Sequence, residues 1–164
     1  LRDRHPNFNI DLVIDPLAKP GRLSVGFAKF PITPQVTDTW NDFNNNAKYE
    51  PEQGETYNDV NGNNKFDPVW IAGFHNRRPA QGVHDDLCAR VRVLDDGATR
   101  VAITSSDAVG FIYDDAVDIR KSAHDKNNCD YTIISSTHVH QAPDLIGIWG
   151  ESFFKSDVNK EYMR

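Results

Sequence analysis

The chain has 164 residues, of which 38% are hydrophobic and 26% are charged, a balance typical of one globular domain rather than a disordered segment. Its net charge of −6 and its scattered lysines and arginines argue against nucleic-acid binding, which favours clustered basic faces. No apolar run approaches the ~20 residues that a membrane-spanning helix needs, so no transmembrane segment is predicted.

The two ends of the sequence suggest a piece of a longer protein. Leu1 opens it without Met and without a charged-then-apolar leader, so any signal peptide has been removed or left out. Residues 157–164 have the pattern of a helix that is only beginning. We therefore expect residues 1–164 to form a single partial domain.

The first part of the chain is irregular apart from one strand. Residues 1–22 contain three prolines, so we expect an irregular lead-in. A strand is predicted at Leu23–Phe30, ended by Pro31 and Pro34 because proline donates no ladder hydrogen bond. A polar, asparagine-rich insertion then covers about residues 35–70. So long an irregular stretch is unusual in a compact domain unless something, such as a metal ion, orders it.

After residue 87 the pattern becomes regular. Residues 89–94 alternate as a strand, Asp95-Asp96-Gly97 indicates a turn, and residues 100–105 form an apolar strand. Helical spacing then predicts a helix near residues 111–124, before a strand at 131–136. Strand, helix and strand make a βαβ unit with parallel strands. The predicted fold class is α/β, or mixed α+β: a mixed sheet flanked by helices, plus the calcium-binding-like insertion.

Two polar clusters follow the two strands of this unit. They are Ser105-Ser106-Asp107 and Thr137-His138-Val139-His140. Functional groups gather beyond the carboxyl ends of parallel strands, so we expect the two clusters to be neighbours in space.

The His138-Val139-His140 stretch is the most informative motif. Residues i and i+2 share a face of a continuing strand, so both imidazoles can approach one site. Imidazole suits zinc, and a catalytic zinc usually has three protein ligands and an open position. The alternative is that one or both histidines only form hydrogen bonds at a strand end.

Two further residues are candidates for lining a cleft at this edge. Asp107 directly follows an apolar strand, where it either orients a histidine or caps the helix that begins near Phe111. His84 lies in a loop that enters a strand, so it either lines the cleft or lies on the surface.

A second metal site is predicted inside the insertion. Residues 59–67 place oxygen donors at positions 1, 3, 5 and 9 and a main-chain carbonyl at position 7, as in the first part of an EF-hand calcium loop. The predicted calcium ligands are Asp59, Asn61, Asn63, the Lys65 carbonyl and Asp67.

This loop departs from the EF-hand pattern at two positions. Position 6 is Asn64 rather than glycine, although asparagine tolerates left-handed backbone. Position 12 is Trp70 rather than glutamate, so Asp38, Asp42 or Glu55 must replace the missing acid. The alternative is a turn cluster of asparagine and glycine with solvated acids.

The sequence contains two cysteines, Cys88 and Cys129. Two are too few for a disulfide framework, and no C-x-x-C pair indicates a thiolate metal site. We expect two partly buried free thiols rather than a bridge.

Four segments together carry a family resemblance: Val25-Gly26-Phe27-Ala28-Lys29-Phe30-Pro31-Ile32-Thr33-Pro34, Gln81-Gly82-Val83-His84-Asp85-Asp86-Leu87-Cys88-Ala89-Arg90, residues 100–110, and Ser135-Ser136-Thr137-His138-Val139-His140-Gln141-Ala142-Pro143. In this order they resemble the N-terminal catalytic domain of the neutral/alkaline non-lysosomal ceramidase family. The resemblance spans about residues 23–150 without the insertion, and the histidine segment is its most specific part.

The resemblance implies a secreted or periplasmic, zinc-dependent hydrolase that cleaves an amide bond in a small-molecule or lipid substrate such as a sphingolipid. His138 would be a zinc ligand, with zinc polarising the scissile carbonyl. His140 would be the catalytic residue beside the substrate, forming a hydrogen bond to the oxyanion or moving a proton. The family's other ligands, a histidine, a glutamate and a tyrosine, have no counterpart before Arg164. We expect the remainder of the catalytic domain, downstream or in another chain, to supply them.

The sequence departs from the family after the histidines. Ceramidases continue with Ser-Gly-Pro-Gly, whereas this chain has Gln141-Ala142-Pro143-Asp144. Gln141 and Asp144 at a pocket rim would hinder entry of two lipid chains, so another amide or ester, such as a modified carbohydrate, is an alternative substrate. A second function class is a calcium-stabilised extracellular binding module without catalysis.

Overall fold

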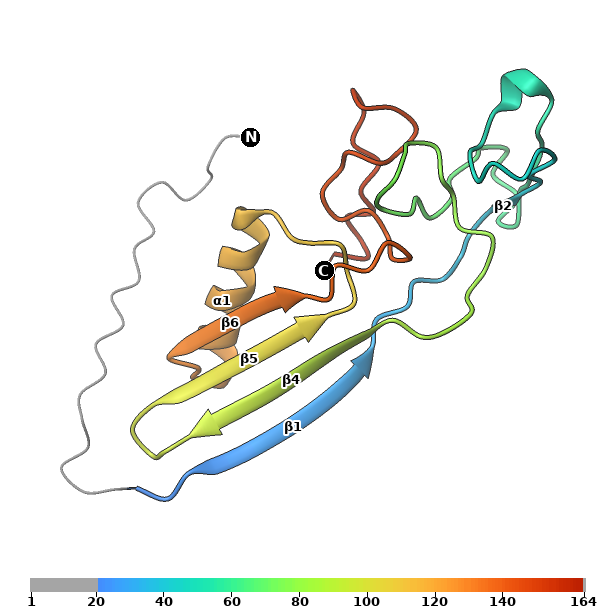
Figure 1. Cartoon of the computed structure of the whole chain (residues 1–164). Coiled ribbons are helices and arrows are strands. Elements are labelled where there is room, and N and C mark those ends of the chain that lie inside the picture. The colour runs from blue at the N-terminus through green and yellow to red at the C-terminus, as the bar shows by residue number, and fades with distance from the viewer. Residues whose placement is uncertain (1–20, 164) are drawn as a thin grey trace.

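The structure is a computed structural model, and it describes residues 21–163. Four strands form one mixed sheet in the order β1-β4-β5-β6 (Figure 1). The β1–β4 and β4–β5 pairs are antiparallel, and β5–β6 is parallel. The strands are β1 (Ser24–Pro31), β4 (Cys88–Asp95), β5 (Arg100–Ser106) and β6 (Tyr131–Ser136).

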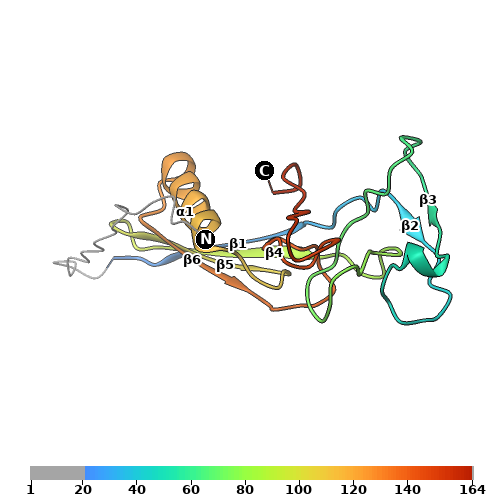
Figure 2. The same cartoon turned by 90° about the horizontal axis from the view of Figure 1, so that it is seen from above.

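The predicted βαβ unit is confirmed. Strand β5 leads into helix α1 (Tyr113–Asn127), which returns the chain to β6 in parallel register, from Val101 opposite Tyr131 to Ser106 opposite Ser136. The helix lies on one face of the sheet and packs on β6 through the fully buried Val117 (Figure 2). It ends at Asn128, which takes the left-handed conformation common after a helix.

The expectation of helices flanking the sheet is wrong for the described residues. They contain a single α-helix, and the fold is mostly β. Every residue of the edge strand β1 is exposed. The hydrophobic spacing predicted these strands correctly, but it did not reveal that only one helix covers them.

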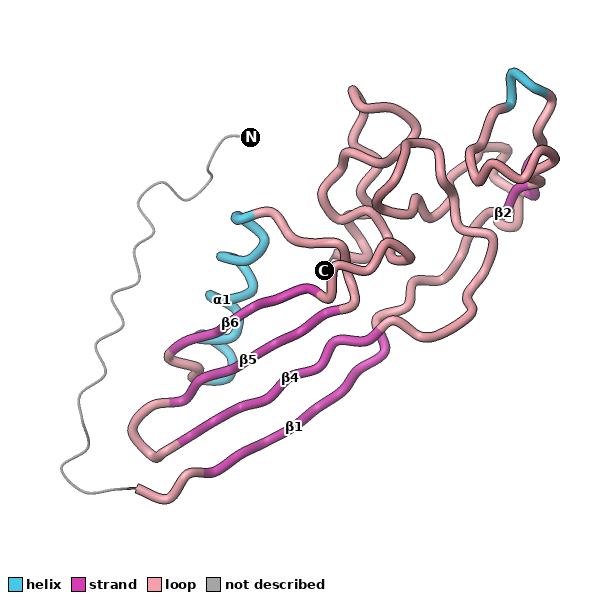
Figure 3. The backbone as a smooth tube through the Cα atoms, viewed as in Figure 1, coloured by secondary structure: helices cyan, strands magenta, loops and turns pink. Residues whose placement is uncertain are grey.

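The rest of the described chain is mostly loops at one end of the sheet (Figure 3). These loops leave β1, β5 and β6 and enter β4 at that same end (Figure 1). The insertion contains a small hairpin of β2 (Thr39–Trp40) and β3 (Tyr57–Asn58), with a 3-10 turn at Pro51–Gln53 between the two strands. Its aromatic side chains form a cluster in which Tyr49 and Phe66 have ring centroids 4.3 Å apart.

Several smaller expectations have clear outcomes. Both cysteines are buried and free. Residues 157–163 form turns rather than the start of a helix, and the Tyr162 hydroxyl donates to the Ile32 carbonyl at 2.5 Å. Of the lead-in predicted for residues 1–22, residues 1–20 lie outside the described part of the chain. Within residues 21–163, no helix has the length and apolar character to cross a membrane.

Candidate metal centre

The histidine segment begins where β6 ends. Thr137 extends the ladder by one hydrogen bond, from its N–H to the Ser106 carbonyl at 3.0 Å. His138 then turns the chain away, with a left-handed φ of 58°. The expected continuing strand is therefore wrong, because β6 ends at Ser136 before either histidine. The two imidazoles still approach each other, with ring centroids 5.0 Å apart at 71°.

The imidazole of His138 is oriented by the loop that follows β5. Its Nδ1 lies 2.7 Å from the Val109 carbonyl oxygen. A carbonyl only accepts hydrogen bonds, so Nδ1 carries the proton and the neutral ring keeps its lone pair on Nε2. A metal-ligating imidazole usually donates its other ring N–H to such a carbonyl, to a carboxylate or to water.

His140 is held by contacts on its ring and its backbone. Its ring centroid lies 4.9 Å from that of Phe74, and its Nδ1 is buried without a hydrogen-bond partner among the described residues. A Cβ added to Gly73 would lie 2.1 Å from this Nδ1, so only glycine fits beside the ring. Gly73 also has a φ of 90°, which side-chain-bearing residues rarely adopt.

Arg78 supports this segment from behind and was not predicted from the sequence. Its guanidinium is buried, donates to the carbonyls of His140 and Ala72, and lies 5.1 Å from the Phe74 ring centroid. Burial lowers the pKa of Arg78. Nothing in the local sequence distinguishes this buried arginine from its more exposed neighbour Arg77.

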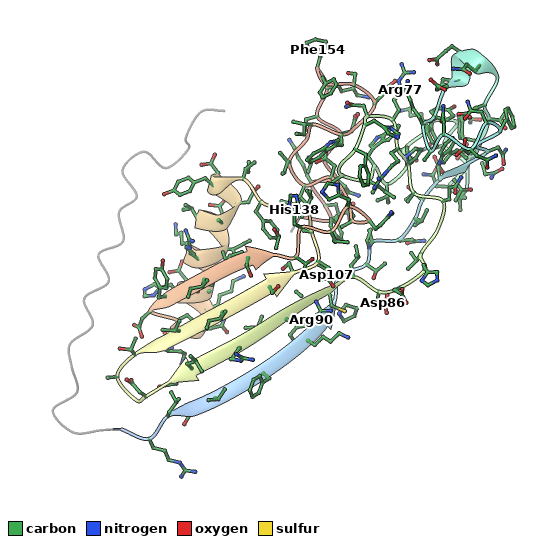
Figure 4. All side chains as sticks on the ribbon, viewed as in Figure 1. Arg77, Asp86, Arg90, Asp107, His138 and Phe154 are labelled. Atoms are coloured by element: carbon green, nitrogen blue, oxygen red, sulfur yellow. The ribbon has the colours of Figure 1, made fainter. Side chains whose placement is uncertain are left out.

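Asp107 joins the ends of three strands. Its carboxylate accepts hydrogen bonds from the Cys88 N–H at 2.9 Å, from Arg90 Nη1 at 3.0 Å and from the Thr137 hydroxyl at 3.2 Å (Figure 4). Partial burial would raise the pKa of Asp107, but the hydrogen bonds from Arg90 and Cys88 outweigh it and lower that pKa.

Both roles considered for Asp107 are therefore wrong. Its carboxylate binds Arg90 rather than a histidine, and the helix N-cap is Ile112 without a side-chain cap. The predicted proximity of the two strand-end clusters does hold, because Asp107 contacts Thr137.

A cleft of about 760 Å³ lies beside the loop that follows β6. Asp107, Thr137, Gln141 and His84 line it together with apolar side chains. The His84 side chain is 97% exposed, and its Nδ1 lies 2.7 Å from Asp85 Oδ2. His138 and His140 are not among the described residues that line this cleft.

Asp144 does not lie at a pocket rim as a free charge. It is 3% exposed, and its carboxylate accepts the N–H groups of Ile146, Gly147 and Trp149 at 2.8–2.9 Å. The carboxylate of Asp144 thus organises its own loop, and Asp144 lines a cleft with Trp70 and Tyr162; its effect on lipid entry stays a prediction. Gln141 is exposed and does line the cleft.

The predicted calcium ligands come together in one loop. Asp59 accepts the N–H groups of Asn63 at 3.1 Å and Asn64 at 2.7 Å. The amides of Asn61 and Asn63 reach the Asp67 carboxylate at 3.1 and 3.0 Å. Hydrogen bonds therefore link the side chains at positions 1, 3, 5 and 9 within one loop, and the side-chain oxygens of Asn61 and Asn63 accept the N–H groups of Asn63 and Lys65.

Within the described range, no group of three or more His, Cys, Asp or Glu side chains is arranged to hold a metal ion. His138 therefore offers Nε2 as a single well-oriented nitrogen. The residues present fit the first part of a zinc site, because the Val109 carbonyl orients the imidazole as a metal ligand requires.

No protein-family model and no curated protein matches the sequence. Among solved structures, neutral ceramidase from Pseudomonas aeruginosa matches with a TM-score of 0.50 and 14% identity, over 77% of this chain and 16% of that chain. A ceramidase complexed with C2 matches with a TM-score of 0.44 and 14% identity over the same shares. The chain has the fold of a partial ceramidase-like region.

This ceramidase-like region spans about one sixth of the ceramidase that it matches. At 14% identity the match shows the fold alone, so the chemistry of the site has to be inferred from its own residues. Those residues are the oriented His138 and the supported His140, which alternate along the chain with the cleft-lining Thr137, Val139 and Gln141.

Proposed function

We propose that this chain is the His138-bearing part of a zinc-dependent hydrolase that cleaves an amide, or N-acyl, bond. The observation that carries the proposal is the hydrogen bond between His138 Nδ1 and the Val109 carbonyl, which leaves Nε2 available as a ligand. The ceramidase-like fold supports it. The remaining zinc ligands come from residues outside this chain.

A zinc ion supplies Lewis acidity toward a carbonyl oxygen and lowers the pKa of water toward neutrality. His138 contributes one ligand nitrogen to it. The ring of His140 lies 5.0 Å from that of His138, and its Nδ1 is packed against Gly73, so Nε2 is the nitrogen left to donate to a developing oxyanion or to carry a proton. Arg78 and Gly73 fix the position of this ring through its backbone and its close packing.

The lining of the cleft favours an acyl chain as part of the substrate. Apolar side chains line much of it: Val36, Val69, Ile71, Val83, Leu87 and Val139. Such surface binds hydrocarbon, while polar groups at one end orient the bond to be cleaved. A sphingolipid amide fits this description. An amide or ester of another acyl compound, such as a modified carbohydrate, fits the same chemistry. We infer that such an enzyme acts outside the cell or in the periplasm, as members of the ceramidase family that it resembles do.

Calcium completes the proposal as a structural ion in the insertion. Asp59, Asn61, Asn63, the Lys65 carbonyl and Asp67 are its ligands in this loop. Calcium prefers six to eight hard oxygen donors, and the side chains of this loop are already gathered by hydrogen bonds.

Replacing His140 tests the proposed chemistry without removing the metal ligand. In the full-length protein, His140→Ala should keep its zinc and lose about 10²- to 10⁴-fold in turnover of N-acyl substrates. His124→Ala is the matched control, because that histidine is exposed in the last turn of α1, and its activity should stay at the wild-type value. An unchanged rate in His140→Ala would contradict the role of His140.

A further inference from the structure

The insertion contains an internal repeat. Residues 40–51 read W-N-D-F-N-N-N-A-K-Y-E-P, and residues 57–68 read Y-N-D-V-N-G-N-N-K-F-D-P. The second copy lies 17 residues after the first and keeps the Asp, both alternate Asn, the Lys and the Pro. We call residues 42–50 the first loop and residues 59–67, which hold the predicted calcium ligands, the second loop.

The two loops share one backbone conformation. In the first loop Asn45 and Ala47 have φ values of 56° and 59°, and in the second the equivalent Gly62 and Asn64 have 71° and 60°. A left-handed alanine is unfavourable because its Cβ crowds the following carbonyl. Ala47 therefore takes this conformation because the rest of the loop imposes it.

The two loops also share one hydrogen-bond pattern. Asp42 accepts the N–H groups of Asn46 at 3.1 Å and Ala47 at 2.9 Å, as Asp59 does in the second loop. The amides of Asn44 and Asn46 reach the Glu50 carboxylate at 3.5 and 2.8 Å. The side chains at positions 1, 3, 5 and 9 of the first loop are therefore linked by the same hydrogen bonds as in the second loop.

A local two-fold arrangement relates the copies. Trp40 pairs with its own equivalent, Tyr57, in the β2–β3 hairpin. On either side of this pair, Asn41 Nδ2 donates to the Thr56 hydroxyl at 2.9 Å, and Asn58 Nδ2 donates to the Thr39 hydroxyl at 3.0 Å. The hairpin thus holds the two loops as a pair.

Each copy sends one buried acid to the other loop. Asp38, which is 0% exposed, accepts the N–H groups of Asp67 and Val60, both at 3.0 Å. Its equivalent Glu55, which is 5% exposed, accepts the Glu50 N–H at 2.7 Å. The acids therefore cross: each precedes its own loop and contacts the last residue of the other.

The Glu55 carboxylate indicates that a ligand binds at the first loop. Its Oε1 is buried and has no hydrogen-bond partner among the described residues. Asp38 differs, because both its oxygens accept N–H groups. A buried carboxylate oxygen without a donor is unfavourable, and a bound cation removes the penalty.

We propose that the first loop is a second divalent-cation site, of calcium class, and that Glu55 closes it. Its ligands are oxygens of Asp42, Asn44, Asn46, Glu50 and Glu55 and the Lys48 carbonyl. With one bidentate carboxylate this set reaches the six to eight oxygens that calcium prefers. Asp38 takes the equivalent place at the second loop, where its two oxygens already accept the N–H groups of Val60 and Asp67.

The Lys48 ammonium lies 2.9 Å from Glu50 Oε1, so a cation in the first loop must displace it from that oxygen. Lys48 is half exposed on a flexible stem and can turn to solvent. Its competition predicts that Lys48→Met binds calcium in the first loop more tightly than the wild type does.

Counting calcium ions in matched variants tests the proposal. Calcium bound to the full-length protein is measured by equilibrium dialysis at roughly millimolar free calcium, the range of extracellular sites. Glu55→Gln and Asp42→Asn should each bind one ion fewer than the wild type. Glu52→Gln is the matched control, because this exposed acid on the same turn pairs only with Arg77, and it should lose none.

The second loop is counted separately with Asp59→Ala, which should lose one further ion when combined with Glu55→Gln. Terbium luminescence, excited through the neighbouring rings of Trp40 and Tyr49, should show the same loss of bound ions. This readout measures ion binding directly rather than the melting temperature of the protein. Wild-type calcium content and wild-type terbium signal in both Glu55→Gln and Asp42→Asn would overturn the second site. If Asp59→Ala alone lost an ion, the calcium site of the second loop would stand by itself.

Discussion

The close contact between Gly73 and His140 makes Gly73→Ala a quantitative test of how the site is built. The added Cβ would lie 2.1 Å from Nδ1 and 2.7 Å from Cγ of His140. The left-handed backbone costs an alanine about 1–2 kcal/mol. Moving the His140 ring off its rotamer adds about 0.5–1.5 kcal/mol. We therefore expect Gly73→Ala to lower the free energy of unfolding by about 2–3 kcal/mol.

Gly97→Ala separates the two contributions. Gly97 has the same φ of 90°, but a Cβ there meets nothing within 4 Å. This variant should show the backbone cost alone. Thermal denaturation followed by circular dichroism should show a drop of roughly 5–10 °C for Gly73→Ala and about half of that for Gly97→Ala. His140→Ala in the Gly73→Ala background should recover the excess. Equal drops in the two glycine variants would refute the proposed contact.

Three further predictions concern other parts of the molecule. Hydrogen bonds from Arg90 and Cys88 lower the pKa of Asp107, so the Asp107 carboxylate should stabilise the fold fully above pH ~4 and lose this effect as the pH falls further. Denaturant melts of Asp107→Asn should not show this fall in stability. Asp59→Ala should reduce the melting temperature and the protease resistance of the insertion as a calcium chelator does, and a chelator without effect on the wild type would contradict the structural ion. Val117→Ala empties a fully buried position under α1 and should cost about 2 kcal/mol, whereas Ile119→Ala, at a 38% exposed position, should cost less than half as much in the same melts.

Local sequence patterns predicted the elements that repeat a simple period. Alternation identified β4, an apolar run identified β5, and helical spacing identified α1; the order of these elements predicted the parallel pairing with β6. Each of these inferences depends on residues close together in the chain. The single helix found within residues 21–163 was not predictable in this way, because the number of helices depends on what the sheet packs against.

In the candidate site, too, some features were predicted from local sequence and others were not. The two histidines were predicted from their spacing, and the structure brings their rings together. Gly73 and the buried guanidinium of Arg78 contact His140 from more than 60 residues away, and the His138 ring contacts Val109, which lies 29 residues away. No local pattern encodes such contacts.

In the insertion, by contrast, the relation between the first and second loops can be recognised in the sequence. The 17-residue repeat places Asp38 and Glu55 at equivalent positions four residues before each loop. The spacing alone does not show that each acid serves the other loop. That exchange follows from the β2–β3 hairpin, which sets the two copies face to face.

The zinc content of the full-length protein tests the central proposal most directly. Purified wild-type protein, His138→Ala and the exposed-histidine control His84→Ala are compared by elemental analysis after equilibration with zinc. If His138 is a ligand, the wild type and His84→Ala should each hold one zinc ion per chain at this site, and His138→Ala should hold almost none. Wild-type zinc content in His138→Ala would contradict the assignment of His138 as a zinc ligand.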